Sequence, residues 1–271
     1  KRQGPADAAA QKLEIVILRL HHDTDVAGKF LLTGESGIAK AKDELPDNND
    51  IALILHTSGT TSRPKIVPLW QSNITASARN IAISLNLTSS DRCMNVMPLF
   101  HIHGLIAAVA SSLSVGASIW CTGGFNAMTF FASMRAAKPT WYTAVPTMHQ
   151  AILSRAGRNK EIIKANPLRF LRSSSASLPA QVMEALRETF SAPVIEAYGM
   201  TEATHQMCCN PLECQKPGSV GVPAGPEVRI AHESDNHLIK GIGEVVISGP
   251  NVTPGYESNP EANAKNFFEA E

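Results

Sequence analysis

Strand-like and helix-like patterns alternate along this chain between residues 51 and 197. Segments with the pattern of strands lie at 51–56, 66–69, 93–97, 117–121, 140–143, 169–174 and 193–197. Helical patterns fall near 71–85, 102–114, 126–137, 146–155 and 179–190. Strands that alternate with helices pack as mostly parallel sheets whose faces the helices cover. The sequence therefore predicts an α/β fold with mostly parallel β-sheets flanked by helices.

The two ends of the chain have a different character. Periodicity is weak before residue 51, where the apolar stretch 13–20 is expected to form one strand. Beyond residue 214, closely spaced Pro and Gly turns separate two short segments, 228–231 and 244–248, which are expected to be antiparallel strands. We therefore expect three parts, listed in chain order: a partial upstream region with a linker (1–50), an α/β core (51–214) and a small β-rich subdomain (215–271).

Composition excludes several classes of partner. With 271 residues and a hydrophobic fraction of 44%, the chain can bury a sizeable core. A formal net charge of zero gives no electrostatic case for binding nucleic acid. No apolar run approaches the roughly 20 residues that span a bilayer. The five cysteines form no C-x-x-C pair, and two are adjacent, which favours a reducing, intracellular compartment, either cytoplasmic or peroxisomal.

A loop rich in hydroxyl groups follows the strand at 51–56. It reads Thr57, Ser58, Gly59, Thr60, Thr61, Ser62, Arg63, Pro64, Lys65. Backbone N–H groups, hydroxyls and one ammonium group can together hold several phosphate oxygens. A generic cluster of this kind is more often a solvated surface loop. Pro64 and Ile66 flank the lysine where a Walker A motif needs Gly and Ser or Thr, which disfavours a P-loop phosphotransferase.

A second polar segment, Tyr198-Gly199-Met200-Thr201-Glu202, follows the strand at 193–197. Ligands of open α/β sheets bind beyond the carboxyl ends of the parallel strands. There an aromatic ring can cover a base, a hydroxyl can reach phosphate and a carboxylate can bind Mg²⁺. Taken alone, the pattern is more often an ordinary turn between a strand and a helix.

Two further segments carry polar side chains after predicted strands. His101 and His103 lie two residues apart, which supplies too few ligands for a metal site by itself. The serine-rich stretch 172–179 can cap the helix that begins near Pro179, with Ser177 as a candidate N-cap. Taken alone, each segment is more often structural, with its polar side chains hydrogen-bonded to the backbone or to water.

In combination, these motifs resemble those of the adenylate-forming superfamily, which includes acyl-CoA synthetases, luciferases and the adenylation domains of peptide synthetases. The matching segments are T-S-G-T-T-S-x-P-K, the aromatic-His element, the serine-rich loop and Y-G-x-T-E. The run A-Y-G-M-T-E-A-T-H-Q-M together with K-P-G-S-V-G is similar to the oxalyl-CoA synthetase branch. The resemblance covers residues 51–268 and implies a fragment of the superfamily's large N-terminal domain.

The resemblance also implies a reaction. A carboxylate attacks the α-phosphate of MgATP to give an acyl adenylate and pyrophosphate, and coenzyme A then displaces AMP. The β- and γ-phosphates would be held by Thr57, Ser58, Gly59, Thr60, Thr61 and Lys65. Glu202 would bind Mg²⁺ beside Thr201, and His101 would orient the acyl phosphate region. The nucleotide edge would comprise Glu196, Ala197, Tyr198, Gly199, Ser175, Ala176 and Ser177.

The acid is expected to be small and polar, such as oxalate. Ser175 and His205 would donate hydrogen bonds to its distal carboxylate, and His205 would lie on the same turn as Glu202 if that segment is helical. Alternatives are an adenylation domain that loads a carrier protein, a longer-chain or aryl ligase, and a non-catalytic nucleotide-binding remnant. Superfamily members continue to a ribose-binding aspartate, a hinge and a C-terminal lid with a catalytic lysine, so the chain alone is expected to be catalytically incomplete.

Overall fold

The computed structural model describes residues 4–23, 25–26, 29–34, 44–57 and 64–269. The chain divides into two compact units, Lys1–Leu45 and Pro46–Glu271. In the first unit, helix α1 (Pro5–Lys12) precedes an antiparallel hairpin of β1 (Arg19–His22) and β2 (Phe30–Thr33). No helix among these described ranges is long and apolar enough to cross a membrane.

The strand expected at 13–20 is therefore largely wrong, because a helix precedes it and β1 begins only at Arg19. Three consecutive alanines favour the helix, and Pro5 occupies its first turn, where a missing N–H costs little. Asp7 accepts the Gly4 N–H at 3.0 Å and pairs with Arg19 at 2.8 Å. Glu14 then adopts a left-handed φ of 55°, which takes the chain out of the helix.

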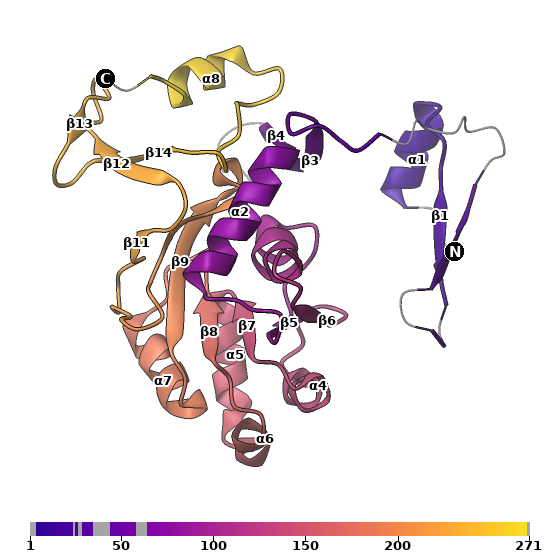
Figure 1. The fold of residues 1–271 in the computed structure, drawn as a ribbon, viewed down its shortest axis with the longest axis vertical. Coiled ribbons are helices and arrows are strands. Elements are labelled where there is room, and N and C mark those ends of the chain that lie inside the picture. The colour runs from indigo at the N-terminus through magenta and orange to yellow at the C-terminus, as the bar shows by residue number, and fades with distance from the viewer. Residues whose placement is uncertain (1–3, 24, 27–28, 35–43, 58–63, 270–271) are drawn as a thin grey trace. The chain divides into compact units, whose positions relative to one another are not determined.

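The second unit is built on a seven-stranded sheet with the order β11-β10-β9-β8-β7-β5-β6 (Figure 1). The strands from β6 to β9 run parallel to one another, whereas β10 and β11 pair antiparallel. The predicted mostly parallel sheet is thus confirmed. Its strands are β5 (Arg92–Asn95), β6 (Ser118–Cys121), β7 (Trp141–Ala144), β8 (Phe170–Ser173), β9 (Val194–Met200), β10 (His205–Cys209) and β11 (Val222–Pro223).

Both faces of this sheet are covered, because successive strand residues point to opposite sides. Tyr142 and Leu171 belong to one buried cluster, and their neighbours Trp141 and Phe170 to the other. The first cluster packs against α4 (Phe130–Ala137), α5 (Pro146–Ala156), α6 (Lys160–Ala165) and α7 (Ala180–Phe190). The second packs against α2 (Gln71–Ser84), the π-helix η1 (His103–Ala110), which continues into α3 (Ser111–Leu113), and the strands β3 (Ile51–His56) and β4 (Ile66–Trp70).

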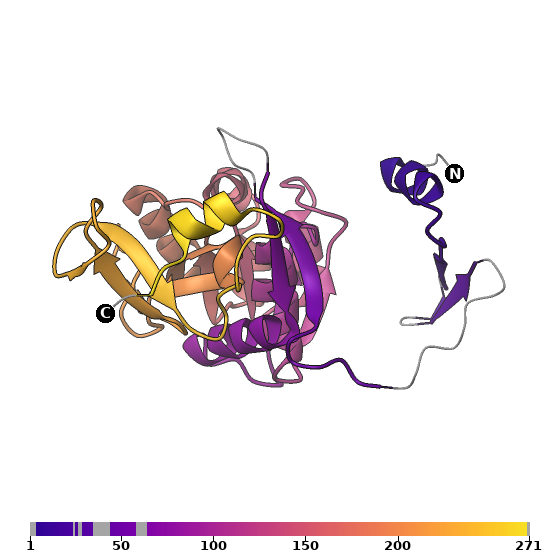
Figure 2. The ribbon, with the colours of Figure 1, turned by 90° about the horizontal axis from the view of Figure 1, so that it is seen from above.

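The first two predicted strands of the core do not join the parallel sheet. Instead, β3 and β4 pair antiparallel with each other, and Figure 2 shows them as two purple arrows side by side. Their hairpin connection contains the hydroxyl-rich loop, of which Thr57, Pro64 and Lys65 are described.

The last part of the chain forms a three-stranded antiparallel sheet with the order β13-β12-β14. Its strands are β12 (Glu227–Ala231), β13 (Leu238–Ile239) and β14 (Glu244–Ser248), so the two expected strands are confirmed. Helix α8 (Pro260–Asn266) was not predicted; the Asn259 side chain caps it by accepting the Ala262 N–H at 3.1 Å. β11 lies beyond residue 215 but pairs with β10 of the large sheet. The subdomain boundary at residue 215 therefore stays a prediction.

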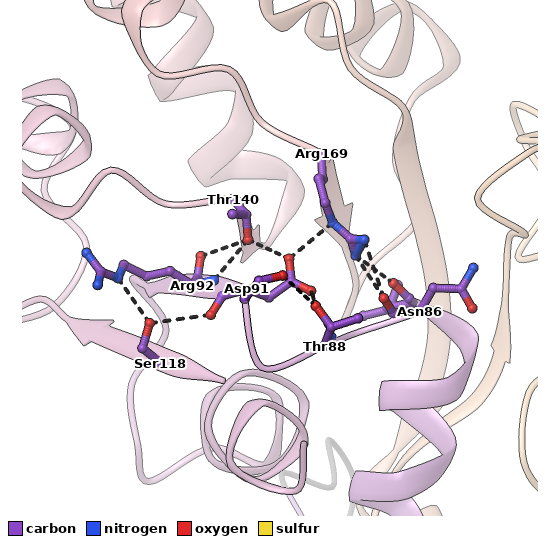
Figure 3. Close-up of polar contacts among 9 residues, drawn as sticks. Asn86, Thr88, Asp91, Arg92, Ser118, Thr140 and Arg169 are labelled. Carbon is purple, nitrogen blue, oxygen red and sulfur yellow. Dashed lines mark hydrogen bonds and ion pairs between the residues drawn. The ribbon is translucent and has the colours of Figure 1, made fainter. Parts of the chain in front are cut away.

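A buried carboxylate ties together the amino-terminal ends of the parallel strands (Figure 3). Asp91 lies just before β5 and is 2% exposed. It accepts a hydrogen bond from the Thr140 hydroxyl at 2.7 Å and pairs with Arg169 Nε at 3.1 Å. Those two residues immediately precede β7 and β8, and Arg169 also donates to the carbonyl of Asn86 at 3.1 Å. These polar contacts lie at the amino-terminal edge of the sheet, whereas ligands of open α/β sheets bind at the opposite, carboxyl-terminal edge.

Candidate functional site

A cleft of about 370 Å³ lies at the carboxyl-terminal edge of the sheet. Its walls come from segments that follow β3, β5 and β8, from the end of β9 and the turn after it, and from the start of β10. The lining residues are Thr57, His101, Ile102, Ser175, Gly199, Met200, Thr201, Glu202 and His205. The fold thus brings most of the separately predicted site segments to one place, as expected for strand ends that share one edge.

Lys65 and Glu202 are connected through Tyr256, which the sequence did not single out. The Tyr256 hydroxyl donates to Glu202 Oε1 at 2.7 Å, and Lys65 Nζ lies 4.6 Å from the centre of the same ring. Burial and the neighbouring carboxylate raise the pKa of Tyr256, so its hydroxyl stays protonated as a donor. The loop closes on itself where the Thr57 N–H donates to the Lys65 carbonyl at 3.0 Å. Ser58, Gly59, Thr60 and Thr61 lie outside the described residues.

Glu202 has the surroundings that a magnesium ligand needs. Tyr256 occupies Oε1, and no other described group bonds to the carboxylate. Mg²⁺ is usually held by one or two carboxylates and completes its shell with water and substrate phosphates. Glu202, with the neighbouring Thr201 in the same cleft, therefore fits a site completed by the phosphates of a bound nucleotide.

The segment after β9 forms a tight hairpin instead of leading into a helix. Thr201–Ala203 makes a single 3₁₀ turn, and the chain then reverses into β10 with His205 opposite Met200. The segment does not continue as a helix, so Glu202 and His205 do not share a helical turn. His205 reaches the cleft through strand pairing, and its φ of 103° shows a backbone held in a costly conformation.

Gly199 is required by this hairpin. A Cβ atom at this position would lie 1.5 Å from the carbonyl oxygen of His205. The structure therefore gives Gly199 a packing role, in addition to its place in the cleft wall.

We expect Gly199→Ala to lower the free energy of unfolding by about 2–3 kcal/mol, because β9 and β10 must separate to admit the methyl group. Thermal unfolding would measure the effect. Gly157→Ala is the matched control, since that glycine follows α5 with no atom within 4 Å of an added Cβ. A control variant that loses as much stability as Gly199→Ala would contradict the explanation.

The loop after β8 is anchored to β9. The Ser174 hydroxyl donates to the Ala197 carbonyl at 2.8 Å, and Glu196 Oε1 accepts the Leu178 N–H at 2.8 Å. Glu196 is 2% exposed, and burial raises its pKa. This carboxylate therefore holds the loop in position and does not line the cleft.

Other residues predicted for the nucleotide edge are placed as follows. Ala176 and Ser177 are exposed, Ala197 is buried, and the Tyr198 side chain is 39% exposed and accessible for stacking. Ser177 is not the N-cap of α7, because Pro179 holds that position without a side-chain hydrogen bond.

Three histidines lie in or behind the cleft. His101 Nδ1 accepts the backbone N–H of His103 at 3.1 Å, so its Nε2 carries the proton in the neutral ring. Desolvation lowers the pKa of His101, and burial lowers those of His103 and His205 well below the usual value. All three rings are therefore neutral near pH 7. The rings of His103 and His205 stack with their centres 5.1 Å apart.

A polar network behind the cleft was not predicted from the sequence, although two of its members, His103 and His205, were singled out there. It connects His103 and His205 to the buried Arg172, and includes Thr143 and Gln206. Thr143, Arg172 and Gln206 lie on three different strands, and no local motif connects them to the two histidines. The available sign of this network in the sequence was an arginine within an apolar strand, because a buried arginine usually has polar partners.

Hydroxyl groups and a carboxylate lie at the carboxyl ends of strands, and Lys65 immediately precedes β4. This arrangement is typical of nucleotide-binding α/β proteins. A family model for AMP-binding enzymes matches residues 3–257, and the chain belongs to this family. The resemblance to the adenylate-forming superfamily is thereby confirmed.

Curated relatives and solved structures agree with this assignment. The chain is 47% identical to an oxalate–CoA ligase of Arabidopsis thaliana, over 97% of this chain and 53% of the relative. It is 45% identical to an oxalate–CoA ligase of Saccharomyces cerevisiae, over 83% of this chain and 41% of the relative. The ATP-bound structure of MatB from Rhodopseudomonas palustris matches with a TM-score of 0.76 at 28% identity, over 83% of this chain and 44% of that one. The chain thus spans about half the length of the curated relatives it matches.

Proposed function

We propose that this chain carries the adenylation site of an ATP-dependent acid–CoA ligase. The supporting observation is the cleft in which Thr57, His101, Thr201 and Glu202 meet at the carboxyl ends of the strands. The substrates would be a carboxylic acid, ATP and coenzyme A. Membership of the AMP-binding family and the names of the two curated relatives support the same reaction.

The residues of the cleft would act mainly by positioning and by electrostatic stabilisation. Thr57 and Lys65 would hold the β- and γ-phosphates while the acid's carboxylate attacks the α-phosphate and pyrophosphate leaves. His101 would donate its Nε2–H to the acyl phosphate region, because its Nδ1 is already used as an acceptor. Glu202 would hold Mg²⁺, which supplies charge neutralisation at the phosphate oxygens when bound.

The acid is proposed to be small and polar, with oxalate as the first candidate. Ser175 and His205 line the cleft and offer hydrogen-bond donors. A long apolar acid would leave these donors unpaired, which disfavours such a substrate. Two relatives with the printed name oxalate–CoA ligase support the same choice.

An exchange assay on the protein as its gene encodes it would test the proposal. We expect ATP–pyrophosphate exchange that depends on oxalate and exceeds the exchange with acetate, hexanoate or benzoate. Thioester formation should then require coenzyme A. Exchange with none of these acids would overturn the ligase proposal, whereas exchange that is strongest with hexanoate or benzoate would overturn the choice of acid. Adenylation without transfer to coenzyme A would favour loading of a carrier protein.

A further inference from the structure

Arg172, the third residue of β8, is a fully buried cation without an acidic partner. Its exposed fraction is 0%, and Nε has no hydrogen-bond partner. The guanidinium reaches Gln206 Oε1 at 3.1 Å and His205 Nε2 at 3.2 Å, and among the described residues no carboxylate pairs with it. Burial lowers the pKa of Arg172 to about 10, so the group remains charged at neutral pH. An uncompensated buried charge costs several kcal/mol, roughly the desolvation penalty per ion.

This cation sets the direction of the hydrogen bonds around it, because a guanidinium group can only donate. Since Arg172 Nη2 donates to His205 Nε2, the proton of the neutral His205 ring is on Nδ1. Among the described residues, that Nδ1 has no hydrogen-bond partner. His205 lines the cleft and therefore retains an unused donor there.

A second chain of hydrogen bonds leads from Arg172 to Ser175. Arg172 Nη1 donates to Thr143 Oγ1 at 3.4 Å, and the Thr143 hydroxyl donates to His103 Nε2 at 2.6 Å. The proton of His103 is then on Nδ1, which donates to Ser175 Oγ at 3.0 Å. Because its oxygen accepts this bond, the Ser175 hydroxyl is free to donate its own proton into the cleft.

The two residues that Arg172 orients share a costly backbone conformation. Ser175 has a φ of 74° and His205 a φ of 103°, both in the region that disfavours non-glycine residues. Backbone strain of this kind persists where the surrounding structure enforces it, and it clusters at functional sites. This end of the cleft thus combines two fixed donors with a buried positive charge behind them.

We propose that Arg172 is the positioning residue that makes this end of the cleft specific for the second carboxylate of a short dicarboxylic acid. The guanidinium acts through His205 and Ser175: it keeps both as donors and supplies the charge that the second carboxylate neutralises. A monocarboxylic acid of similar size lacks the group that would use these features. The inference rests on the proposed ligase function.

The test compares Arg172→Met with the unmodified protein, using oxalate and glyoxylate in ATP–pyrophosphate exchange. Glyoxylate replaces the second carboxylate by an uncharged carbonyl group. We expect kcat/KM for oxalate to fall on the order of 100-fold, mainly through KM, while glyoxylate changes less than about threefold. Arg172→Lys, which restores a charge with fewer donors, should recover part of the oxalate preference.

Arg169→Met is the matched control for a purely structural effect. Arg169 precedes the same strand but bonds to Asp91 at the far edge of the sheet. We expect this variant to lose thermal stability while keeping the ratio of kcat/KM for oxalate to that for glyoxylate. Thermal unfolding and MgATP affinity, measured on each variant, show whether Arg172→Met is folded.

The two proposals fail in different ways. If the unmodified protein activates neither acid but activates hexanoate or benzoate, the choice of acid is wrong, and if it activates none of these acids, the ligase function is wrong. If it prefers oxalate and a folded Arg172→Met keeps that preference, the assignment of Arg172 alone is wrong. Equal loss for both acids with MgATP binding intact would also overturn it, because a general structural role would then explain the result. Should Arg172→Met fail to fold, the Arg172→Lys variant decides: unchanged preference for oxalate would overturn the assignment.

Discussion

Glu202→Gln is expected to lower ATP–pyrophosphate exchange on the order of 10²- to 10³-fold. The substitution keeps the shape of the side chain and an oxygen that accepts the Tyr256 hydroxyl, which now lies 2.7 Å from Oε1. It removes the negative charge that would hold Mg²⁺ in the cleft. The loss should therefore appear in kcat/KM for MgATP and be partly relieved at high Mg²⁺ concentration, with thermal stability unchanged.

Glu188→Gln, on the exposed side of α7, is the control for the loss of one negative charge. It should leave exchange and stability as they are. An exchange rate for Glu202→Gln within threefold of the unmodified protein, across a range of Mg²⁺ concentrations, would remove Glu202 from the proposed site.

Tyr256→Phe should give a smaller loss, about 10- to 100-fold, because it removes the group that orients Glu202 and not the carboxylate itself. The ring stays in place beneath Lys65, so the cation–π contact at 4.6 Å is kept. An Mg²⁺ dependence that shifts in the same direction as for Glu202→Gln would connect the two residues. An effect on acid preference alone would argue against this connection.

The sequence predicted the parallel part of the fold because each of those strands is a short apolar segment between helical patterns. It did not predict β10, whose pattern is obscured: every residue from His205 to Cys209 is buried, including a histidine and a glutamine. Those polar residues are satisfied by partners far away in sequence, such as Arg172 for Gln206. Such contacts leave no local pattern, so the segment resembled the continuation of a helix after Glu202.

The same limit applies to the site. The hydroxyl-rich loop and the Thr201–Glu202 pair are local motifs, so the sequence alone could predict a site role for both. Tyr256 meets Glu202 across 54 positions, and Arg172 meets His205 across 33. Their roles depend on hydrogen-bond direction and burial, which follow only from the folded arrangement.

The Asp91 contacts lie at the amino-terminal edge of the central sheet, and the cleft lies at the carboxyl-terminal edge. The last prediction concerns the first of these edges. Asp91→Ala should lower the free energy of unfolding by about 3 kcal/mol, since hydrogen bonds to a charged group contribute roughly 1.5–3 kcal/mol each and the variant also leaves buried donors unpaired. The donors are the Thr140 hydroxyl at 2.7 Å, the Thr88 N–H at 2.9 Å and Arg169 Nε at 3.1 Å. Arg169 is 40% exposed and can turn to water, which limits the loss.

Glu184→Ala is the matched control, because it also removes a carboxylate that pairs with an arginine. The Glu184–Arg187 pair lies at the surface of α7, with side chains 44% and 52% exposed. Its loss should cost less than about 0.5 kcal/mol, as is usual for exposed pairs within a helix. Thermal and urea unfolding would measure both changes. Because Asp91 lies at the edge opposite the cleft, the KM for ATP of folded Asp91→Ala should be unchanged. A raised KM under conditions in which the variant is folded would show that the two edges are coupled.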